Sequence, residues 1–385
     1  MPGSLQRPVK VLHIAETIRG GIASYLNELH PQQEASFGAG NVHYVVPSDH
    51  RGDLAVDDAQ MTTFGRSGRS VSGLFQMLRA SLQAIDAFKP NVVHLHSSFA
   101  GLVLRPALAA RPQAPSVIYC PHGLAFSRKA GRVSHQITKA AENLLARTTD
   151  RIICISADEF NEAVRAGISA DRLTLVHNGI SKTRPQPVAA PWPTKKTKVL
   201  FIGRLDRQKG YDLLIEAARQ LEDVLDVRIV GASVVNKYQG PAVPSNVTLL
   251  GWLDRGEIET HLEAADLVVI PSRWEAFGLV ALEAMRAAKP ILAFRIGALP
   301  EIVVDGATGA LCEPVSAGQL VEGFRRMLDL DLKVLGNRGY DRFKQFYDVE
   351  KTHRQLRQVY MDVLERNELR PEKQVQLQSD LSSNI

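Results

Sequence analysis

Two glutamates, Glu275 and Glu283, are the residues of this chain whose type and spacing most directly suggest chemistry. An apolar run at 266–270 ends at Pro271, and from Leu279 onward the apolar residues follow helical spacing. This pattern predicts a buried parallel strand, a loop and a helix. We expect Glu275 in the loop, at the carboxyl edge of the sheet. Glu283 should lie about one turn into the helix, because each helical residue adds a rise of ~1.5 Å.

The residues between the two glutamates predict an anion site. Phe277, Gly278 and Leu279 supply the first backbone N–H groups of the helix, which lack an intrahelical partner and favour a negative charge. Two acceptors that flank such a site suit a ligand with hydroxyls at both ends and a diphosphate in the middle, and a nucleotide sugar is such a ligand. The alternative is an ordinary strand–helix unit with two solvated glutamates.

The segment EAFGLVALE resembles the Glu-x7-Glu motif of the retaining glycosyltransferases of GT-B fold. In particular, it resembles the large family of bacterial polysaccharide, lipopolysaccharide-core and phosphatidylinositol mannosyl transferases. The resemblance extends to about Glu365 and implies an α/β GT-B fold, with two Rossmann-like parallel-sheet domains facing a central cleft. We expect an N-terminal acceptor-binding domain at 1–181, a proline-rich linker at 182–196 and a C-terminal donor-binding domain at 197–348. A helix at 349–365 should pack back onto the first domain, and a polar tail at 370–385 should be disordered.

Two further motifs lie in the N-terminal half. Gly20 and Gly21 follow a predicted strand at 8–15, and glycines in such a turn let backbone amides approach a ligand closely. The resemblance places them at the donor phosphates, whereas a plain tight turn is the alternative. His122 follows a strand at 116–120 in a carboxyl-end loop, where ligands of parallel sheets bind. The resemblance implies that this histidine orients the donor sugar.

Arg204 and Lys209 lie in a glycine-flanked turn after a predicted strand at 198–202. Two cations in such a turn suit a diphosphate leaving group, although a basic surface turn would look the same. The resemblance assigns the phosphates to Arg204 and Lys209, the donor-sugar hydroxyls to Glu275 and the ribose to Glu283. Residues 231–233 depart from the Gly-x-Gly-Pro of the family, so the nucleotide, UDP or GDP, stays open.

Neither histidines nor aspartates predict a metal site. His94 and His96 would share one face of a strand, but no third ligand is visible in the sequence, and a pair of strand-end histidines near the cleft is the favoured interpretation. Asp329 and Asp331 fit the Asp-x-Asp pattern of metal-dependent transferases, yet they lie between two helical segments. We therefore expect a metal-independent enzyme with no cofactor besides its nucleotide-sugar co-substrate.

Composition places this chain among ordinary globular proteins. Its 385 residues favour two domains, and its 45% hydrophobic and 23% charged residues are typical values. No apolar run approaches the ~20 residues of a membrane-spanning helix, and the first residues show no signal-peptide core. Cys120, Cys154 and Cys312 lie far apart in apolar segments, so we expect them to be buried and reduced in a cytoplasmic protein.

The net charge of +5 is compatible with anionic substrates or an anionic membrane surface. Basic and apolar residues alternate in 99–111 and 128–150, which suits peripheral contact with the inner face of the cytoplasmic membrane, and a solvated helix face is the alternative.

The family resemblance implies a retaining hexosyltransferase that moves a sugar from a nucleotide diphosphate sugar to an acceptor hydroxyl in cell-surface polysaccharide, lipopolysaccharide or glycolipid synthesis. The partners would be the donor and a sugar or lipid-linked acceptor, with no nucleic acid. Two alternatives are a GT-B epimerase or phosphorylase, and a non-catalytic nucleotide-sugar-binding module.

Overall fold

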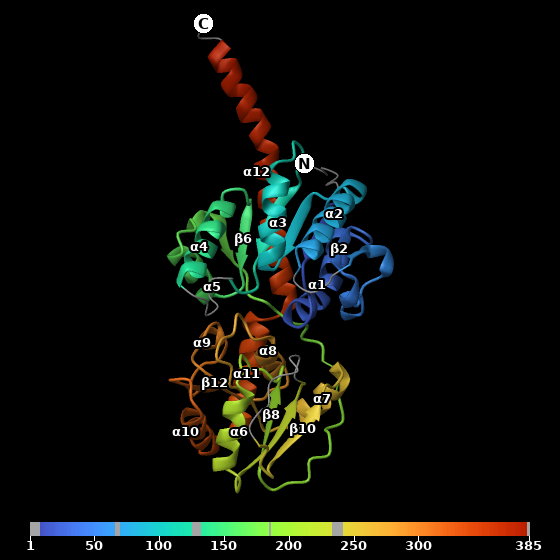
Figure 1. Cartoon of the computed structure of the whole chain (residues 1–385). Helices are drawn as coiled ribbons and strands as arrows, with labels where there is room; N and C mark the ends of the chain where they lie inside the picture. Colours follow the sequence, from blue (N-terminus) through green and yellow to red (C-terminus); the bar gives the residue numbers. More distant parts are fainter. Residues whose placement is uncertain (1–7, 66–69, 125–131, 185, 233–241, 383–385) are drawn as a thin grey trace. The chain divides into compact units, whose positions relative to one another are not determined.

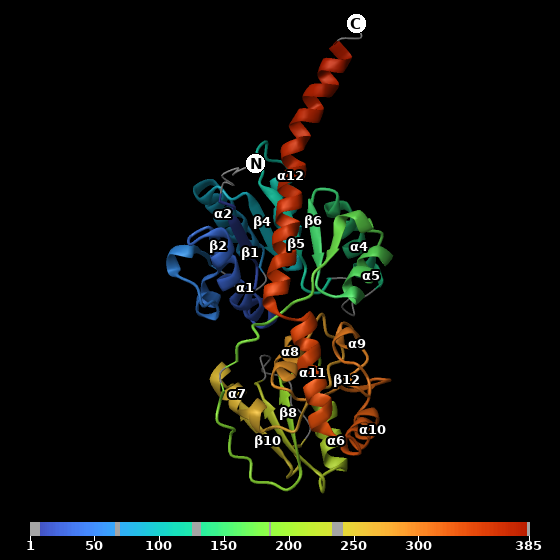
Figure 2. The same cartoon turned by 180° about the vertical axis from the view of Figure 1, so that it is seen from behind.

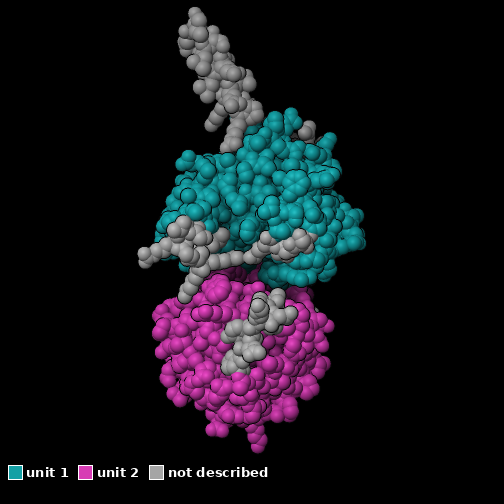
Figure 3. Space-filling view, viewed as in Figure 1, with its two compact units in different colours: residues 1–178, 349–385 teal, residues 179–348 magenta. Residues whose placement is uncertain are grey.

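The computed structural model describes residues 8–65, 70–124, 132–184, 186–232 and 242–382 (Figure 1). The chain divides into two compact units, which Figure 3 shows in teal and magenta. Unit 1 comprises residues 1–178 and 349–385, and unit 2 comprises residues 179–348. Each unit is built around its own parallel sheet, as the sequence predicted.

Unit 1 contains a parallel sheet in the order β3-β2-β1-β4-β5-β6-β7. Every residue of β1, β4 and β5 is buried, which is the pattern of strands that are covered on both faces. The strand order reverses between β1 and β4, so the loops after these strands open at a topological switch point, where α/β sheets bind ligands. The strands are β1 (Val11–Ala15), β2 (Val42–Pro47), β3 (Met61–Phe64), β4 (Val92–His96), β5 (Ser116–Cys120), β6 (Arg151–Cys154) and β7 (Leu173–Leu175).

The helices of unit 1 cover its sheet and include the last helix of the chain, α12, which contacts α1 and β5 (Figure 2). α12 continues to Ser382, so it includes most of the segment for which the sequence predicted disorder. The polar composition of this segment indicates that it has no hydrophobic core to pack on. It can still be helical, because Glu, Lys, Gln and Leu are favourable helix formers. The helices are α1 (Gly21–Phe37), α2 (Val71–Phe88), α3 (Ser98–Ala109), α4 (Arg132–Ala146), α5 (Ala157–Arg165) and α12 (Val349–Ser382), with short 3₁₀ turns η1 (Ser48–Asp53), η2 (Asp58–Gln60) and η4 (Ala170–Arg172).

Unit 2 contains a parallel sheet in the order β10-β9-β8-β11-β12-β13, and its switch point lies between β8 and β11. The two loops that carry the predicted cations and the first predicted glutamate therefore leave adjacent strands. The elements are β8 (Thr197–Ile202), α6 (Tyr211–Gln220), β9 (Leu225–Val230), β10 (Val247–Gly251), α7 (Arg255–Ala264), β11 (Leu267–Ile270), α8 (Leu279–Arg286), β12 (Ile291–Phe294), α9 (Leu299–Ile302), β13 (Gly309–Cys312), α10 (Ala317–Leu328) and α11 (Leu332–Phe346).

The proline-rich segment 182–196, which was expected to be a linker, packs on unit 2. Trp192 is buried there, and its indole N–H donates to Asp226 Oδ1 at 3.0 Å. The guanidinium of Arg228 lies 4.2 Å from the centre of the Trp192 ring. Prolines suppress regular structure, but one buried aromatic side chain is enough to fasten an irregular segment to a domain.

Candidate functional site

The switch point of unit 2 brings together two residues that the sequence predicted separately. Lys209 Nζ, after β8, lies 2.5 Å from Glu275 Oε2, after β11. The same carboxylate oxygen accepts a hydrogen bond of 3.2 Å from Ser272 Oγ. The side chains of Lys209 and Glu275 are 21% and 10% exposed, so the pair is largely shielded from water. Among the described residues, Glu275 Oε1 has no hydrogen-bond partner and is free to accept a ligand hydroxyl.

Glycines allow the two loops to approach this closely. Gly210 has a φ of 69°, and a Cβ at this position would lie 1.9 Å from the carbonyl oxygen of Pro271. Gly297 has a φ of 51°, and its Cβ would lie 1.9 Å from the carbonyl oxygen of Glu275. Any larger residue would collide with backbone, so these positions require glycine. No local signal in the sequence indicated this packing role for either glycine.

The loop after β8 is held by side chains that the sequence analysis did not identify. Arg273 forms a bidentate ion pair with Asp212 at 2.7 and 2.6 Å, and it donates to the carbonyl oxygen of Arg207 at 2.8 Å. The amide of Lys209 donates to Asp206 Oδ1 at 3.0 Å. These contacts fix the backbone from which Lys209 extends toward Glu275.

Arg204, the other predicted cation, is placed differently from Lys209. Its side chain is 45% exposed, lies 3.1 Å from Asp206 Oδ2 and donates to Gln208 Oε1 at 2.8 Å. An exposed ion pair of this kind contributes little to stability, so Arg204 can exchange its partners for a phosphate at small cost.

Helix α8 begins at Leu279, after the N-cap residue Gly278, and has no side-chain cap. The amides of Leu279 and Val280 have no partner among the described residues, whereas that of Ala281 already donates to Gly278 O at 2.9 Å. Leu279, from the predicted Phe277 to Leu279 set, and Val280 therefore each present a backbone N–H group to a ligand. The Phe277 side chain is 3% exposed and contributes to packing.

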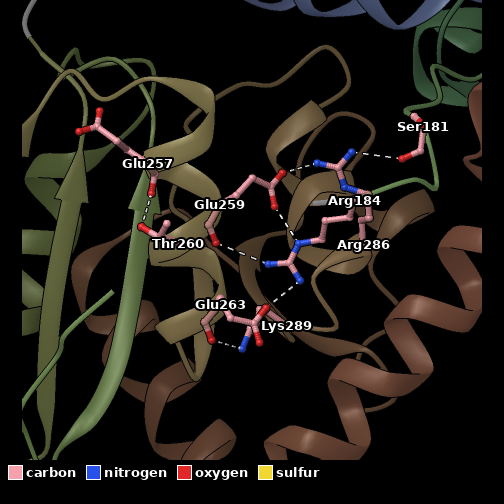
Figure 4. A network of polar contacts seen from close by, with 8 residues as sticks. All are labelled: Ser181, Arg184, Glu257, Glu259, Thr260, Glu263, Arg286 and Lys289. Carbon is pink, nitrogen blue, oxygen red and sulfur yellow. Dashed lines mark hydrogen bonds and ion pairs between the residues drawn. The ribbon is translucent and has the colours of Figure 1, made fainter. Parts of the chain in front are cut away.

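Glu283 lies on α8, in its second half, and is partly buried. The end of the same helix is anchored by a buried network, which Figure 4 shows. Arg286 pairs with Glu259 of α7 and donates to the carbonyl oxygen of Ser181 at 3.1 Å. Arg184 donates to Glu259 Oε2 at 2.7 Å. The network holds α8 against α7 and so fixes the helix on which Glu283 lies.

In unit 1, Gly20 and Gly21 are exposed at the start of α1. Gly20 has a φ of 91°, a conformation that favours glycine, and a Cβ at either position would meet nothing within 4 Å. The N-terminus of α1 has no side-chain cap. The space above these backbone groups is open, which suits the predicted approach of a ligand to the amides.

His122 follows β5 with a φ of 52°, an uncommon value for a non-glycine residue. Its Nε2 lies 2.9 Å from His96 Nδ1. Burial lowers the pKa of His122 to about 3, so the ring is neutral near pH 7. The next residue, Gly123, donates its amide to Glu159 Oε1 at 2.8 Å, and burial raises the pKa of the Glu159 carboxyl to about 7.

The prediction for His94 and His96 is corrected by the structure. Both side chains are fully buried inside unit 1, because all of β4 is covered on both faces. A third histidine, His13 of β1, completes a group whose ligand nitrogens lie within 4.8 Å of one another. No third ligand is apparent from the sequence, because His13 lies on a different strand. Two of these nitrogens, His13 Nδ1 and His96 Nε2, are 2.9 Å apart and form a hydrogen bond.

The predictions for Asp331 and for the three cysteines concern residues outside these sites. Asp331 caps α11 by accepting from the amide of Val334 at 3.0 Å, as expected for a residue between two helices. Cys120, Cys154 and Cys312 are free and buried, as predicted.

The stretch 99–111, which the sequence offered for membrane contact, contains an arginine that the fold buries. Arg105 is fully buried, where it pairs with Glu142 Oε2 at 2.7 Å and lies over the Tyr119 ring, so it cannot contact lipid. Arg128 and Lys129 lie outside the described residues. Within the described part of the chain, no helix has the length and apolarity to cross a membrane.

Comparison with known proteins gives two family models and several relatives. The model described as "Glycosyltransferase Family 4" matches residues 19–184, and "Glycosyl transferases group 1" matches residues 183–342. A Klebsiella pneumoniae protein described as "Uncharacterized 41.2 kDa protein in cps region" is 33% identical over 329 residues, which are 82% of this chain and 88% of the relative.

Solved structures share the fold. Sucrose-phosphate synthase from Thermosynechococcus elongatus superposes with a TM-score of 0.79 at 20% identity, over 93% of this chain and 100% of that chain. Anabaena HepE in complex with UDP-glucose superposes with a TM-score of 0.74 at 17% identity, over 92% of this chain and 99% of that chain.

Proposed function

Because the chain belongs to the glycosyltransferases that combine these two domain families and has the GT-B fold, we propose that it transfers a sugar from a nucleotide diphosphate sugar to an acceptor hydroxyl. In this reaction the bond between the anomeric carbon and the β-phosphate oxygen breaks, and a bond to the acceptor oxygen forms. The acceptor loses a proton, and the nucleoside diphosphate leaves. Synthesis of a polysaccharide or a glycolipid is the process that we infer.

The observation that carries the proposal is the Lys209–Glu275 pair beside the N-terminus of α8. An ammonium group has three N–H donors, and the described contacts of Lys209 Nζ use one of them, to Glu275. The remaining donors, Arg204 and the amides of Leu279 and Val280 can bind the diphosphate. Preorganised donors of this kind stabilise the charge that grows on a leaving group without needing to reorganise.

The two glutamates have different roles in this proposal. Glu275 Oε1 accepts a hydroxyl of the donor sugar, while Oε2 keeps Lys209 in place. Glu283 accepts the ribose hydroxyls. In unit 1, Gly20 and Gly21 offer backbone amides to the donor phosphates, and His122 orients the sugar. These roles follow the family resemblance, and the local geometry within each unit supports them.

Several finer features are part of the proposal. We infer a retaining, metal-independent hexosyltransferase that takes UDP or GDP sugars, and the HepE complex with UDP-glucose favours UDP. The acceptor would be a sugar or a lipid-linked saccharide, presented at the inner face of the cytoplasmic membrane. Turnover should survive excess EDTA, and restoration of lost activity by magnesium or manganese would contradict the metal-independent mechanism.

The test begins with a thermal-shift screen of UDP and GDP sugars, because a donor that binds the folded state raises the melting temperature by mass action. Release of the nucleoside diphosphate is then measured with and without saccharide acceptors. Arg204→Ala/Lys209→Ala should abolish release, whereas Arg207→Ala serves as a matched control, since Arg207 is an exposed cation in the same turn.

The outcomes of this test distinguish the alternatives. Binding without release would indicate a non-catalytic module. Conversion of the donor without an acceptor to an epimeric nucleotide sugar, or a requirement for inorganic phosphate, would indicate an epimerase or a phosphorylase.

A further inference from the structure

A chain of hydrogen bonds inside unit 1 links His122 to a buried glutamine. His122 Nε2 lies 2.9 Å from His96 Nδ1, and His96 Nε2 lies 2.9 Å from His13 Nδ1. His13 Nε2 in turn lies 2.8 Å from Gln33 Oε1, on α1. His13, His96 and Gln33 are at most 1% exposed, so water does not compete for these bonds.

The three rings of the chain are neutral near pH 7. His13 and His96 are buried, and no carboxylate is among the described hydrogen-bond partners of the three rings, so a positive charge on any of them would be unpaired. A neutral imidazole has one N–H and one acceptor nitrogen. Each ring in the chain must therefore donate on one side and accept on the other.

The amide oxygen of Gln33 sets the direction of the whole chain, because a carbonyl oxygen can only accept. His13 then carries its hydrogen on Nε2 and accepts on Nδ1 from His96. His96 accepts on Nδ1 from His122 Nε2–H. The last atom, His122 Nδ1, is left with a lone pair and has no hydrogen-bond partner among the described residues.

Backbone strain beside the His122 ring indicates that the position of this ring is constrained. His122 and Ser97 have φ values of 52° and 78°, which are strained for residues other than glycine. They follow the adjacent strands β5 and β4, and the amide of Ser97 donates to the carbonyl oxygen of Cys120 at 3.2 Å. Strain of this kind persists only where the surrounding structure over-determines the conformation.

We propose that Gln33, His13 and His96 are positioning residues that fix the tautomer of His122, so that its Nδ1 is a hydrogen-bond acceptor and its ligand is a hydroxyl group. The identification of this hydroxyl with the donor sugar rests on the proposed function, whereas the tautomer does not. His94 is excluded from the relay, since its Nδ1 lies 2.7 Å from the hydroxyl of Tyr360 on α12.

The tautomer can be measured on the ligand-free protein. Long-range proton–nitrogen correlation spectra of ¹⁵N-histidine-labelled protein distinguish protonated from unprotonated ring nitrogens. We expect His122 to be protonated on Nε2 and bare on Nδ1 at pH 7. A hydrogen on Nδ1, or a charged ring, would overturn the proposal without any variant.

Gln33→Met removes the accepting oxygen at nearly constant volume and should convert His122 into a mixture of both tautomers. Gln60→Met is the matched control, because Gln60 donates to Glu34 Oε1 at 2.8 Å and to the carbonyl oxygen of Val42 at 3.2 Å and takes no part in the relay. An unchanged His122 signal in Gln33→Met would refute the role of Gln33. Metal analysis of the purified protein provides a second check, and a stoichiometric metal at His13, His94 and His96 would replace the relay by a metal site.

Kinetics connect the relay to the proposed function. Gln33→Met should lower kcat/KM for the donor by about tenfold, since a lost hydrogen bond of ~1.4 kcal/mol corresponds to that factor. If the protein shows no transferase activity at all, the proposed function fails while the tautomer measurement still stands. If activity is present and Gln33→Met matches the wild type despite its mixed tautomers, the hydroxyl-accepting role of His122 is wrong.

Discussion

Lys209→Ala tests whether the cation beside Glu275 stabilises the leaving group. The donor already carries a diphosphate in its ground state, but charge grows on the β-phosphate as the glycosidic bond breaks. A cation at this point therefore gains most in the transition state, and only this difference accelerates the reaction. We expect a fall in kcat of ~10²–10³, with a much smaller change in donor affinity.

The structure adds a second consequence of this substitution. Removing Lys209 leaves a carboxylate that is 10% exposed with Ser272 Oγ at 3.2 Å as its remaining described hydrogen-bond donor. Hydrogen bonds to charged groups are worth ~1.5–3 kcal/mol, so Lys209→Ala should also lower the free energy of unfolding by an amount near the lower end of this range. Lys209→Ala/Glu275→Gln should recover much of the stability, because a neutral amide replaces the unpaired charge.

Steady-state kinetics and urea denaturation on both variants separate the two effects. Arg207→Ala is the control and should resemble the wild type in both assays. If the double variant regains turnover together with stability, Lys209 serves only to pair with Glu275. If Lys209→Ala raises only the Michaelis constant, or if Arg207→Ala is the crippled variant, the leaving-group role is wrong.

Three further predictions follow from the geometry. Glu283→Ala should weaken nucleoside diphosphate binding, because a charged acceptor for ribose hydroxyls is worth ~1.5–3 kcal/mol per hydrogen bond, and unchanged affinity in calorimetry would remove this assignment. Gly210→Ala should destabilise the protein far more than Gly251→Ala. Both glycines have a positive φ, but only at Gly210 would a Cβ meet a backbone atom, at 1.9 Å. Equal melting temperatures of the two variants would show that the loops can separate. Stability should fall as the pH drops below 6.5, because the pKa of buried His13 is about 4 in the folded protein and 6.5 in the unfolded chain, which binds more protons in this range. At pH 5 the lowered pKa of His13 reduces the free energy of unfolding by about 2 kcal/mol relative to pH 7. The raised pKa of Glu159, about 7, changes the free energy of unfolding in the opposite direction. Denaturation curves from pH 7 to pH 4 in the wild type and in a His13→Gln variant measure the contribution of the histidine, and parallel curves would contradict it.

The local elements of this protein could be predicted from its sequence because their signals are local. Apolar runs that end at a breaker predicted strands at 198–202 and 266–270, and the structure has Thr197–Ile202 and Leu267–Ile270. The change to helical spacing at Leu279 marks the first residue of α8. The family resemblance implied two parallel sheets, and the alternation of strand and helix is consistent with them, since a parallel pair requires a crossover connection.

The pairing of residues across strands was decided only by the tertiary structure. Lys209 and Glu275 are 66 residues apart, and His13 and His96 are 83 residues apart, so no periodicity links them. The order of strands in each sheet makes β8 adjacent to β11 and β1 adjacent to β4, and that order depends on which apolar faces pack together. Glycine at 210 and 297 then sets how closely the loops approach, because backbone atoms occupy the space where a Cβ would lie. The sequence therefore determined which residues end their strands, and the packing of the sheets determined which of them meet.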